Sequence, residues 1–154
     1  MPEYVIASTA QDFDNAATLF REYAAWLEID LCFQNFEAEL NRLPQMYGPP
    51  DGVIFLCKQD GRLAGCVGVR PFNADRAELK RMWVRKDFRS LGIGETLLTY
   101  ALDFAKKAGY KFINLDTLSH MTSAIRLYEK NGFELSAPYY DNPHADVRYF
   151  SKQL

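Results

Sequence analysis

The chain has 154 residues, of which 48% are hydrophobic and 14% aromatic, enough apolar material for the core of one compact domain over residues 1–154. Its 18 basic and 20 acidic side chains leave a formal net charge of −2. This balance excludes the strong basic field that drives nonspecific binding to nucleic acid, and it favours a small-molecule partner.

The cysteine pattern and the absence of targeting signals predict a cytoplasmic protein without membrane association or a metal site. Cys32, Cys57 and Cys66 lack the C-x-x-C spacing of zinc and redox motifs. Cys57 and Cys66 fall in apolar runs, which favours reduced thiols in the core. The N-terminus has no signal-peptide pattern, and no apolar run approaches the about 20 residues that span a bilayer.

The first half of the chain predicts a strand over residues 3–8 and an amphipathic helix that continues to about residue 29. Apolar residues recur along this helix every three or four positions: Phe13, Ala16, Ala17, Phe20, Tyr23, Ala24 and Leu27. A second helix is predicted over about 34–43, before the proline- and glycine-rich residues 48–52. Residues 53–58 and 63–69 are predicted as strands joined by a hairpin turn at Asp60-Gly61.

In the second half, residues 76–84 predict a strand whose mixed polarity requires a reason. A glycine-containing loop and a helix over 92–108 follow, and the helix has an apolar side formed by Ile93, Leu97, Leu98, Ala101, Ala105 and Ala108. Shorter elements are expected at 111–116 (strand), 121–130 (helix), 133–137 (strand) and 147–152 (strand). The order β-α-α-β-β-β-α-β-α-β-β predicts a mixed sheet with a ligand site at the glycine loop.

The glycine loop, Arg89-Ser90-Leu91-Gly92-Ile93-Gly94, has the features of a phosphate cradle. Glycines let an anion approach the backbone, and the N–H groups of a first helical turn lack intrahelical partners. A nucleotide P-loop is excluded because Glu95, rather than lysine, follows Gly94. A dinucleotide-binding loop fits poorly, since it needs a third glycine and an N-terminal position in the chain.

With two further stretches, the loop resembles the GNAT (Gcn5-related N-acetyltransferase) family over nearly the whole chain. The stretches are Ala77-Glu-Leu-Lys-Arg-Met-Trp-Val84 and Ala124-Ile-Arg-Leu-Tyr-Glu-Lys-Asn-Gly-Phe133. The loop at 138–143 is similar to that of small bacterial members. The resemblance implies an α/β (α+β) fold whose mixed, mostly antiparallel central sheet has about seven strands flanked by about four helices.

The resemblance also implies acetyl-CoA as cosubstrate, with its pyrophosphate held by N–H groups from Leu91 to Glu95. The implied cofactor-binding residues are Met82, Val84, Arg89, Ser90, Leu91, Gly92, Ile93, Gly94 and Glu95. Arg89 would add positive charge beside the phosphates. Arg85 and Lys86 are either further phosphate contacts or solvated loop charges.

For catalysis, the resemblance places Glu78 at the position of the family's general base and Tyr128 at that of its general acid. The alternatives are that Glu78 forms an ordinary ion pair with Lys80 or Arg81, and that Tyr128 is a core tyrosine with a satisfied hydroxyl. The backbone N–H of Met82 is expected to contact the thioester oxygen.

The resemblance implies that the acceptor is an amine of a small molecule or a peptide. The oligomeric state is left open between a monomer and a homodimer. The candidates to line the acceptor pocket are Tyr139, Tyr140 and Asn142, and also Tyr23, Trp26 and Phe33, whose alternative role is packing in the core.

Relatives commonly have an asparagine that contacts CoA at the position of Met121. The side chain of Ser119, Thr122 or Ser123 would supply that hydrogen bond here, and His120 and His144 are expected to be exposed. The predicted function is direct acetyl transfer to a primary amine in a ternary complex; the alternative is a noncatalytic acyl-CoA-binding sensor or interaction module.

Overall fold

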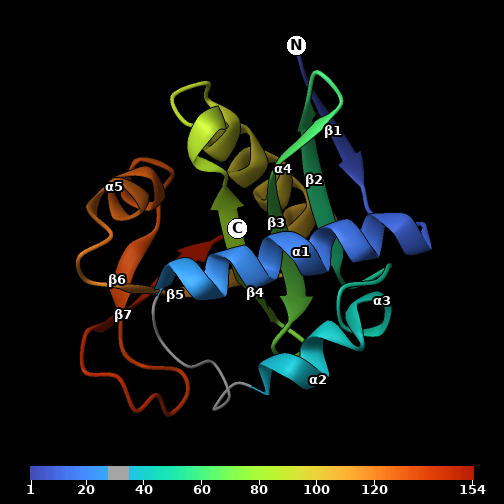
Figure 1. Ribbon diagram of the computed structural model, residues 1–154. Helices are drawn as coiled ribbons and strands as arrows, with labels where there is room; N and C mark the ends of the chain where they lie inside the picture. Colours follow the sequence, from blue (N-terminus) through green and yellow to red (C-terminus); the bar gives the residue numbers. More distant parts are fainter. Residues whose placement is uncertain (28–34) are drawn as a thin grey trace.

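A computed structural model describes residues 1–27 and 35–154, and the seven strands of this part of the chain form one mixed sheet (Figure 1). The strands are β1 (Pro2–Ile6), β2 (Val53–Gln59), β3 (Arg62–Pro71), β4 (Arg76–Val84), β5 (Phe112–Leu118), β6 (Glu134–Ser136) and β7 (Val147–Gln153). Their order is β1-β2-β3-β4-β5-β7-β6, and every neighbouring pair is antiparallel except β4 and β5. The predicted fold class is confirmed.

The described residues contain five α-helices, α1 (Ala10–Leu27), α2 (Phe36–Leu40), α3 (Leu43–Met46), α4 (Ile93–Lys107) and α5 (Thr122–Lys130), and a short 3-10 helix, η2 (Lys86–Phe88). The helix expected over 34–43 is replaced by the short helices α2 and α3. The break precedes Pro44, whose ring cannot continue a helix but fits the first turn of α3. The predicted hairpin turn is confirmed, with positive φ at Asp60 (52°) and Gly61 (76°).

The sheet separates two apolar clusters. On one face, α1, α2 and α3 contribute Leu19, Leu40 and Leu43, respectively, whereas on the other face α4 contributes Leu97 and Leu98. In Figure 1, α1 crosses in front of the strands and α4 lies behind them. The apolar side predicted for α4 is buried except for Ala108, which lies beyond the end of the helix and is exposed.

Two of the three cysteines are buried free thiols, as predicted for Cys57 and Cys66. Cys32 and Phe33 lie outside the described residues. Within residues 1–27 and 35–154, no helix is long and apolar enough to cross a membrane. The same part of the chain holds no group of His, Cys, Asp or Glu side chains arranged to bind a metal ion.

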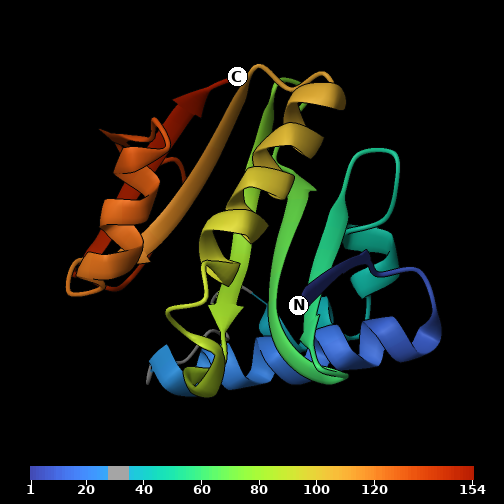
Figure 2. The same ribbon diagram turned by 90° about the horizontal axis from the view of Figure 1, so that it is seen from above.

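The strands β4 and β5 pair only at their beginnings and then separate. Their parallel ladder consists of Arg76 opposite Phe112, Ala77 opposite Ile113, and Glu78 opposite Asn114. Figure 2 shows the two strands diverging beyond this point. The remainder of β4 therefore has no strand neighbour on its β5 side.

A β-bulge in β4 changes which face its side chains take. Trp83 is opposite Cys66 and Lys80 is opposite Gly68, so Arg81 and Met82 together oppose the single residue Val67. Arg81 has a φ of 58°, and its side chain turns toward α2. Beyond the bulge, Met82 packs on the α4 side of the sheet.

Candidate active site

A groove of about 630 Å³ lies along the end of β4, the glycine loop and α5; we call it the glycine-loop groove. Seven of the residues predicted to bind the cofactor line it: Met82, Val84, Arg89, Ser90, Gly92, Ile93 and Gly94. Tyr128 lines it too. Leu91 and Glu95 do not; the Leu91 side chain is exposed, and Glu95 Oε1 forms an ion pair with Lys130 Nζ at 3.1 Å.

The start of α4 presents unpaired backbone donors to this groove. Gly92 precedes the helix with a φ of 77°, a left-handed conformation that glycine adopts without steric cost. Its carbonyl accepts the N–H of Thr96 at 3.1 Å, the first bond of the helix. The N–H groups of Ile93, Gly94 and Glu95 therefore have no partner in the described residues, and the helix dipole favours an anion beside them.

The arginines near the loop already have protein partners. Arg89 donates from Nε to the Val84 carbonyl at 3.1 Å, and its guanidinium lies 5.1 Å from the ring centre of Trp83 and 5.6 Å from that of Trp26. Arg89 is therefore held at the wall of the groove. Arg85 pairs with Glu22 at 2.6 Å and is neither a free phosphate contact nor a merely solvated charge.

Tyr128 is buried in α5, and its ring packs edge-on against Phe133 at 5.7 Å. Among residues 1–27 and 35–154, no group forms a hydrogen bond with its hydroxyl. This differs from the core tyrosine with a satisfied hydroxyl considered as the alternative. Burial, with smaller contributions from Tyr23 and Asp116, raises the pKa of Tyr128, so the phenol is protonated at neutral pH.

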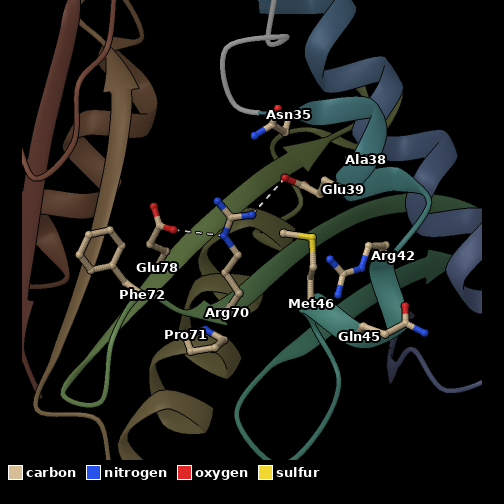
Figure 3. Close-up of a pocket in the computed structure, with 10 residues that line it drawn as sticks. All are labelled: Asn35, Ala38, Glu39, Arg42, Gln45, Met46, Arg70, Pro71, Phe72 and Glu78. Carbon is tan, nitrogen blue, oxygen red and sulfur yellow. Dashed lines mark hydrogen bonds and ion pairs between the residues drawn. The ribbon is translucent and has the colours of Figure 1, made fainter.

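Glu78 lies outside the glycine-loop groove, in a second cavity of about 530 Å³ that we call the α2 cavity (Figure 3). Its Oε1 accepts a hydrogen bond from Arg70 Nε at 3.1 Å, and its Oε2 accepts one from the Tyr139 hydroxyl at 3.0 Å. The ion pair considered with Lys80 or Arg81 was therefore assigned to the wrong partner. Arg70 stands directly opposite Glu78 in the β3–β4 register.

The α2 cavity is lined by Asn35, Ala38, Glu39, Arg42, Gln45, Met46, Arg70, Pro71, Phe72 and Glu78. Glu39, buried at 1% exposure, is its central acid and was not identified from the sequence. Arg81 donates to both of its carboxylate oxygens at 2.9 and 3.1 Å, and Arg70 and Tyr47 add bonds of 3.2 and 3.0 Å. Burial alone would raise the pKa of Glu39, but Arg81 and Arg70 together hold it below its usual value.

The predicted acceptor residues Tyr139, Tyr140 and Asn142 line neither cavity. Tyr139 instead binds Glu78, and the Tyr140 hydroxyl donates to Asp116 Oδ2 at 2.5 Å while it accepts a bond from Asn142 Nδ2 at 3.0 Å. Asp116 also pairs with the buried Lys80 at 3.7 Å. These side chains therefore orient carboxylates beside the cavities.

The remaining candidates divide between the groove and the rest of the surface. Tyr23, Trp26, Met121, Thr122 and Ser123 line the glycine-loop groove. Ser119 does not line it. His120 is exposed at the groove, as expected for its side chain, whereas His144 is half-buried.

The sequence model of the acetyltransferase (GNAT) family matches residues 16–133, which is most of the chain. The protein belongs to this family. A curated relative, an uncharacterised N-acetyltransferase of Schizosaccharomyces pombe, is 37% identical over 146 residues and is matched over 94% of this chain and 90% of its own length. The GNAT protein is therefore an acyltransferase.

Solved structures of GNAT proteins share its fold. A GNAT acetyltransferase of Staphylococcus aureus superposes with a TM-score of 0.80 at 20% identity, over 99% of both chains. The PaiA N-acetyltransferase of Thermoplasma acidophilum, solved with coenzyme A, has a TM-score of 0.73 at 20% identity and covers 100% and 99% of the two chains.

Acetyl-CoA is the cosubstrate of the enzyme. The glycine-loop groove suits this donor, since the three N–H groups at the start of α4 that have no partner among residues 1–27 and 35–154 match a pyrophosphate. A Cβ at Gly94 would lie 3.8 Å from Leu127 and Val84, so protein packing does not require glycine there. Its lack of a side chain instead leaves the backbone open to a ligand.

Proposed function

We propose that the protein transfers the acetyl group of acetyl-CoA to a primary amine of a small molecule or a peptide, by direct attack of the amine in a ternary complex. The observation that carries this proposal is the pair of cavities along β4: the glycine-loop groove contains Met82 and Tyr128, and the α2 cavity contains Glu78. The donor supplies a thioester, an acyl group already activated for attack. The two substrates can therefore be bound together.

Glu78 is the proposed general base. Its carboxylate accepts hydrogen bonds from Arg70 and Tyr139, and a carboxylate is a group that can accept a proton from the attacking amine. Glu78 precedes Met82 by four residues, which is about 13 Å along an extended strand. A glutamate side chain does not span this distance, so the proton reaches Glu78 through intervening water.

Met82 and Tyr128 act on the donor side. The backbone N–H of Met82, at the bulge of β4, donates to the oxygen that gains negative charge during attack, and this contact is independent of the Met82 side chain. The Tyr128 hydroxyl, protonated and without a protein partner in the described residues, donates its proton to the departing thiolate.

Donor binding is assigned to the glycine loop and the start of α4. Ser90, Leu91 and the N–H groups of Ile93, Gly94 and Glu95 hold the pyrophosphate, and Gly92 gives the backbone its turn. Val84 forms the wall, and Arg89 contributes positive charge from its position on Trp83. The reduced thiols Cys57 and Cys66 agree with the proposed cytoplasmic location.

The test is release of free coenzyme A thiol during incubation with acetyl-CoA and a library of amines and peptides. Amine-dependent thiol release with a matching acetylated product supports the proposal. Tight acetyl-CoA binding without turnover on any amine would instead identify the noncatalytic sensor. For Glu78, the pH–rate profile of Glu78→Gln must lose its acidic limb; if the limb remains, another group is the base.

A further inference from the structure

The floor of the α2 cavity is charge-balanced by side chains that neutralise one another. Glu39 pairs with Arg81 at 2.9 Å and with Arg70 at 3.2 Å, and Arg70 pairs with Glu78 at 3.1 Å. Two carboxylates thus face two guanidinium groups, and both Nε and Nη1 of Arg70 donate to carboxylates. The Arg70 guanidinium is therefore already engaged in ion pairs within the cavity.

Arg42 is the cation of this cavity that remains available. It is exposed in the turn between α2 and α3, and it forms no ion pair with any residue in 1–27 or 35–154. Figure 3 shows Arg42 and Glu78 on opposite sides of the cavity, with Arg70 and Met46 between them. The α2 cavity thus has its acid at one side and an available guanidinium at the other.

We propose that the acceptor is an amine that also carries a carboxylate, an amino acid in the broad sense. This inference rests on the proposed function, because the amine is placed toward Glu78, the proposed base. The carboxylate of the acceptor binds the Arg42 guanidinium, whose planar fork matches two carboxylate oxygens. Arg42 is then the residue that determines specificity for the acceptor.

The remaining lining residues agree with such a ligand. Gln45 and Asn35 bring amide groups that can donate to a carboxylate, whereas Phe72 and Met46 offer apolar surface for the carbon chain between the two charged ends. The buried Arg81 lies behind this lining, so three guanidinium groups (Arg42, Arg70 and Arg81) stand against the carboxylates of Glu39 and Glu78, an excess of positive charge. A diamine or polyamine would place a second ammonium group against this excess and would bind less well.

The experiment compares kcat/KM for matched acceptors with acetyl-CoA saturating. Each amino acid of a chain-length series from glycine to 6-aminohexanoate is paired with its primary amide and with a diamine of similar length. The amide keeps the size and hydrogen-bonding capacity but removes the negative charge. We expect the best amino acid to exceed its amide by about 10-fold, the usual size of a charged hydrogen bond.

Variants then assign this preference to Arg42. In Arg42→Gln, the ratio of kcat/KM for the amino acid to kcat/KM for its amide falls to about 1. Arg42→Lys retains part of the preference for the amino acid because the positive charge remains. The matched control is Arg126→Gln, which removes an exposed arginine of α5 that lines neither cavity and leaves the ratio unchanged. Urea unfolding of each variant checks that the fold is retained.

The possible results distinguish specificity for a carboxylate-bearing acceptor from acetyl transfer to amines in general. Acetylation of amides or diamines as fast as amino acids, or an unchanged ratio in Arg42→Gln, overturns the carboxylate-bearing acceptor and leaves amine acetylation intact. If no amine of any series releases thiol, the proposed acetyl transfer fails, and the assignment of Arg42 fails with it.

Discussion

The Tyr139 hydroxyl donates a 3.0 Å hydrogen bond to Glu78 Oε2, across 61 positions of the sequence. Arg70 binds the other carboxylate oxygen, so the proposed base is held from two sides. Burial and the neighbouring Glu78 charge raise the pKa of Tyr139, which keeps its phenol protonated as a donor. We therefore propose Tyr139 as a positioning residue for Glu78; it was predicted to line the acceptor pocket, and in the structure it lines neither cavity.

Tyr139→Phe should therefore lower kcat by about 10-fold, the effect of losing one hydrogen bond to a charged group, with the KM for acetyl-CoA unchanged. Steady-state kinetics measure both constants. The matched control is Tyr110→Phe, which deletes a 2.8 Å bond to the Asp51 carbonyl. It should cost about 1 kcal/mol of unfolding free energy without lowering kcat. An equal decrease of kcat in the two variants would contradict a positioning role for Tyr139.

Tyr128→Phe should separate chemistry from both stability and binding. Because the hydroxyl has no partner in the described residues, its removal should leave the unfolding free energy within about 0.5 kcal/mol of the parent. Loss of the general acid should lower kcat by about 100-fold or more. Urea unfolding, acetyl-CoA titration and turnover are the three measurements. Unchanged turnover would exclude Tyr128 as the acid.

The two glycines of the loop should respond differently to alanine. Gly92 has positive φ with open space around it, so Gly92→Ala should cost about 1–2 kcal/mol through backbone strain alone. Gly94 is helical and its added methyl meets only ordinary contacts, so Gly94→Ala should fold at least as stably. Its methyl should nevertheless raise the Kd for acetyl-CoA, by about 10-fold, by obstructing the approach to the backbone.

Calorimetric titration and urea unfolding distinguish these two effects. Normal acetyl-CoA affinity in Gly94→Ala would show that the ligand does not approach the start of α4 closely. Equal stability of Gly92→Ala and the parent would show that the turn relaxes without cost.

The buried acid Glu39 should dominate the stability of the α2 cavity. Glu39→Gln leaves Arg81 and Arg70 undercompensated and should cost about 3–5 kcal/mol of unfolding free energy at pH 7. Glu37→Gln, the same change in the same helix, removes only an exposed pair with Arg21 and should cost less than about 1 kcal/mol.

The cost of Glu39→Gln should also depend on pH. The pKa of Glu39 is lowered in the folded state, so its contribution is present above the unfolded value of about 4.3 and is lost as the pH falls through the lower folded pKa. Urea midpoints between pH 3 and 7 should show the difference between parent and variant narrowing only at the acidic end. A difference that is constant over this range would contradict the ion-pair explanation.

Much of the fold follows from local patterns. The strand and helix boundaries at β2, β3, β4 and α4 agree with prediction to within about two residues, because hydrophobic periodicity, a hairpin turn and a glycine stop act over short stretches of chain. The glycine loop could be predicted equally well, since its backbone geometry depends on its own residues. The break between α2 and α3 could have been inferred from Pro44.

The α2 cavity could not be predicted in the same way. The mixed polarity of the 76–84 strand was apparent, but its explanation lies in Glu39, which is 42 positions away from Arg81. One signal was present: Glu39 is three residues after Phe36 and therefore lies on the buried side of α2. The partner of Glu78 also depended on the β3–β4 register, in which Arg70 is its direct neighbour.

The bulge at Arg81 divides β4 into two working surfaces. Strict alternation would return Met82 to the face of Glu78; the extra residue instead places it with Val84 on the α4 side. The α2 cavity, which we propose for the acceptor, is built largely by α2, α3 and the end of β3, and the glycine-loop groove is built largely by the glycine loop and α5. Substitutions around Arg42 can therefore change the specificity for the amine while the acetyl-CoA site stays the same. The α2 cavity is for this reason the natural place to redesign the enzyme for a new acceptor.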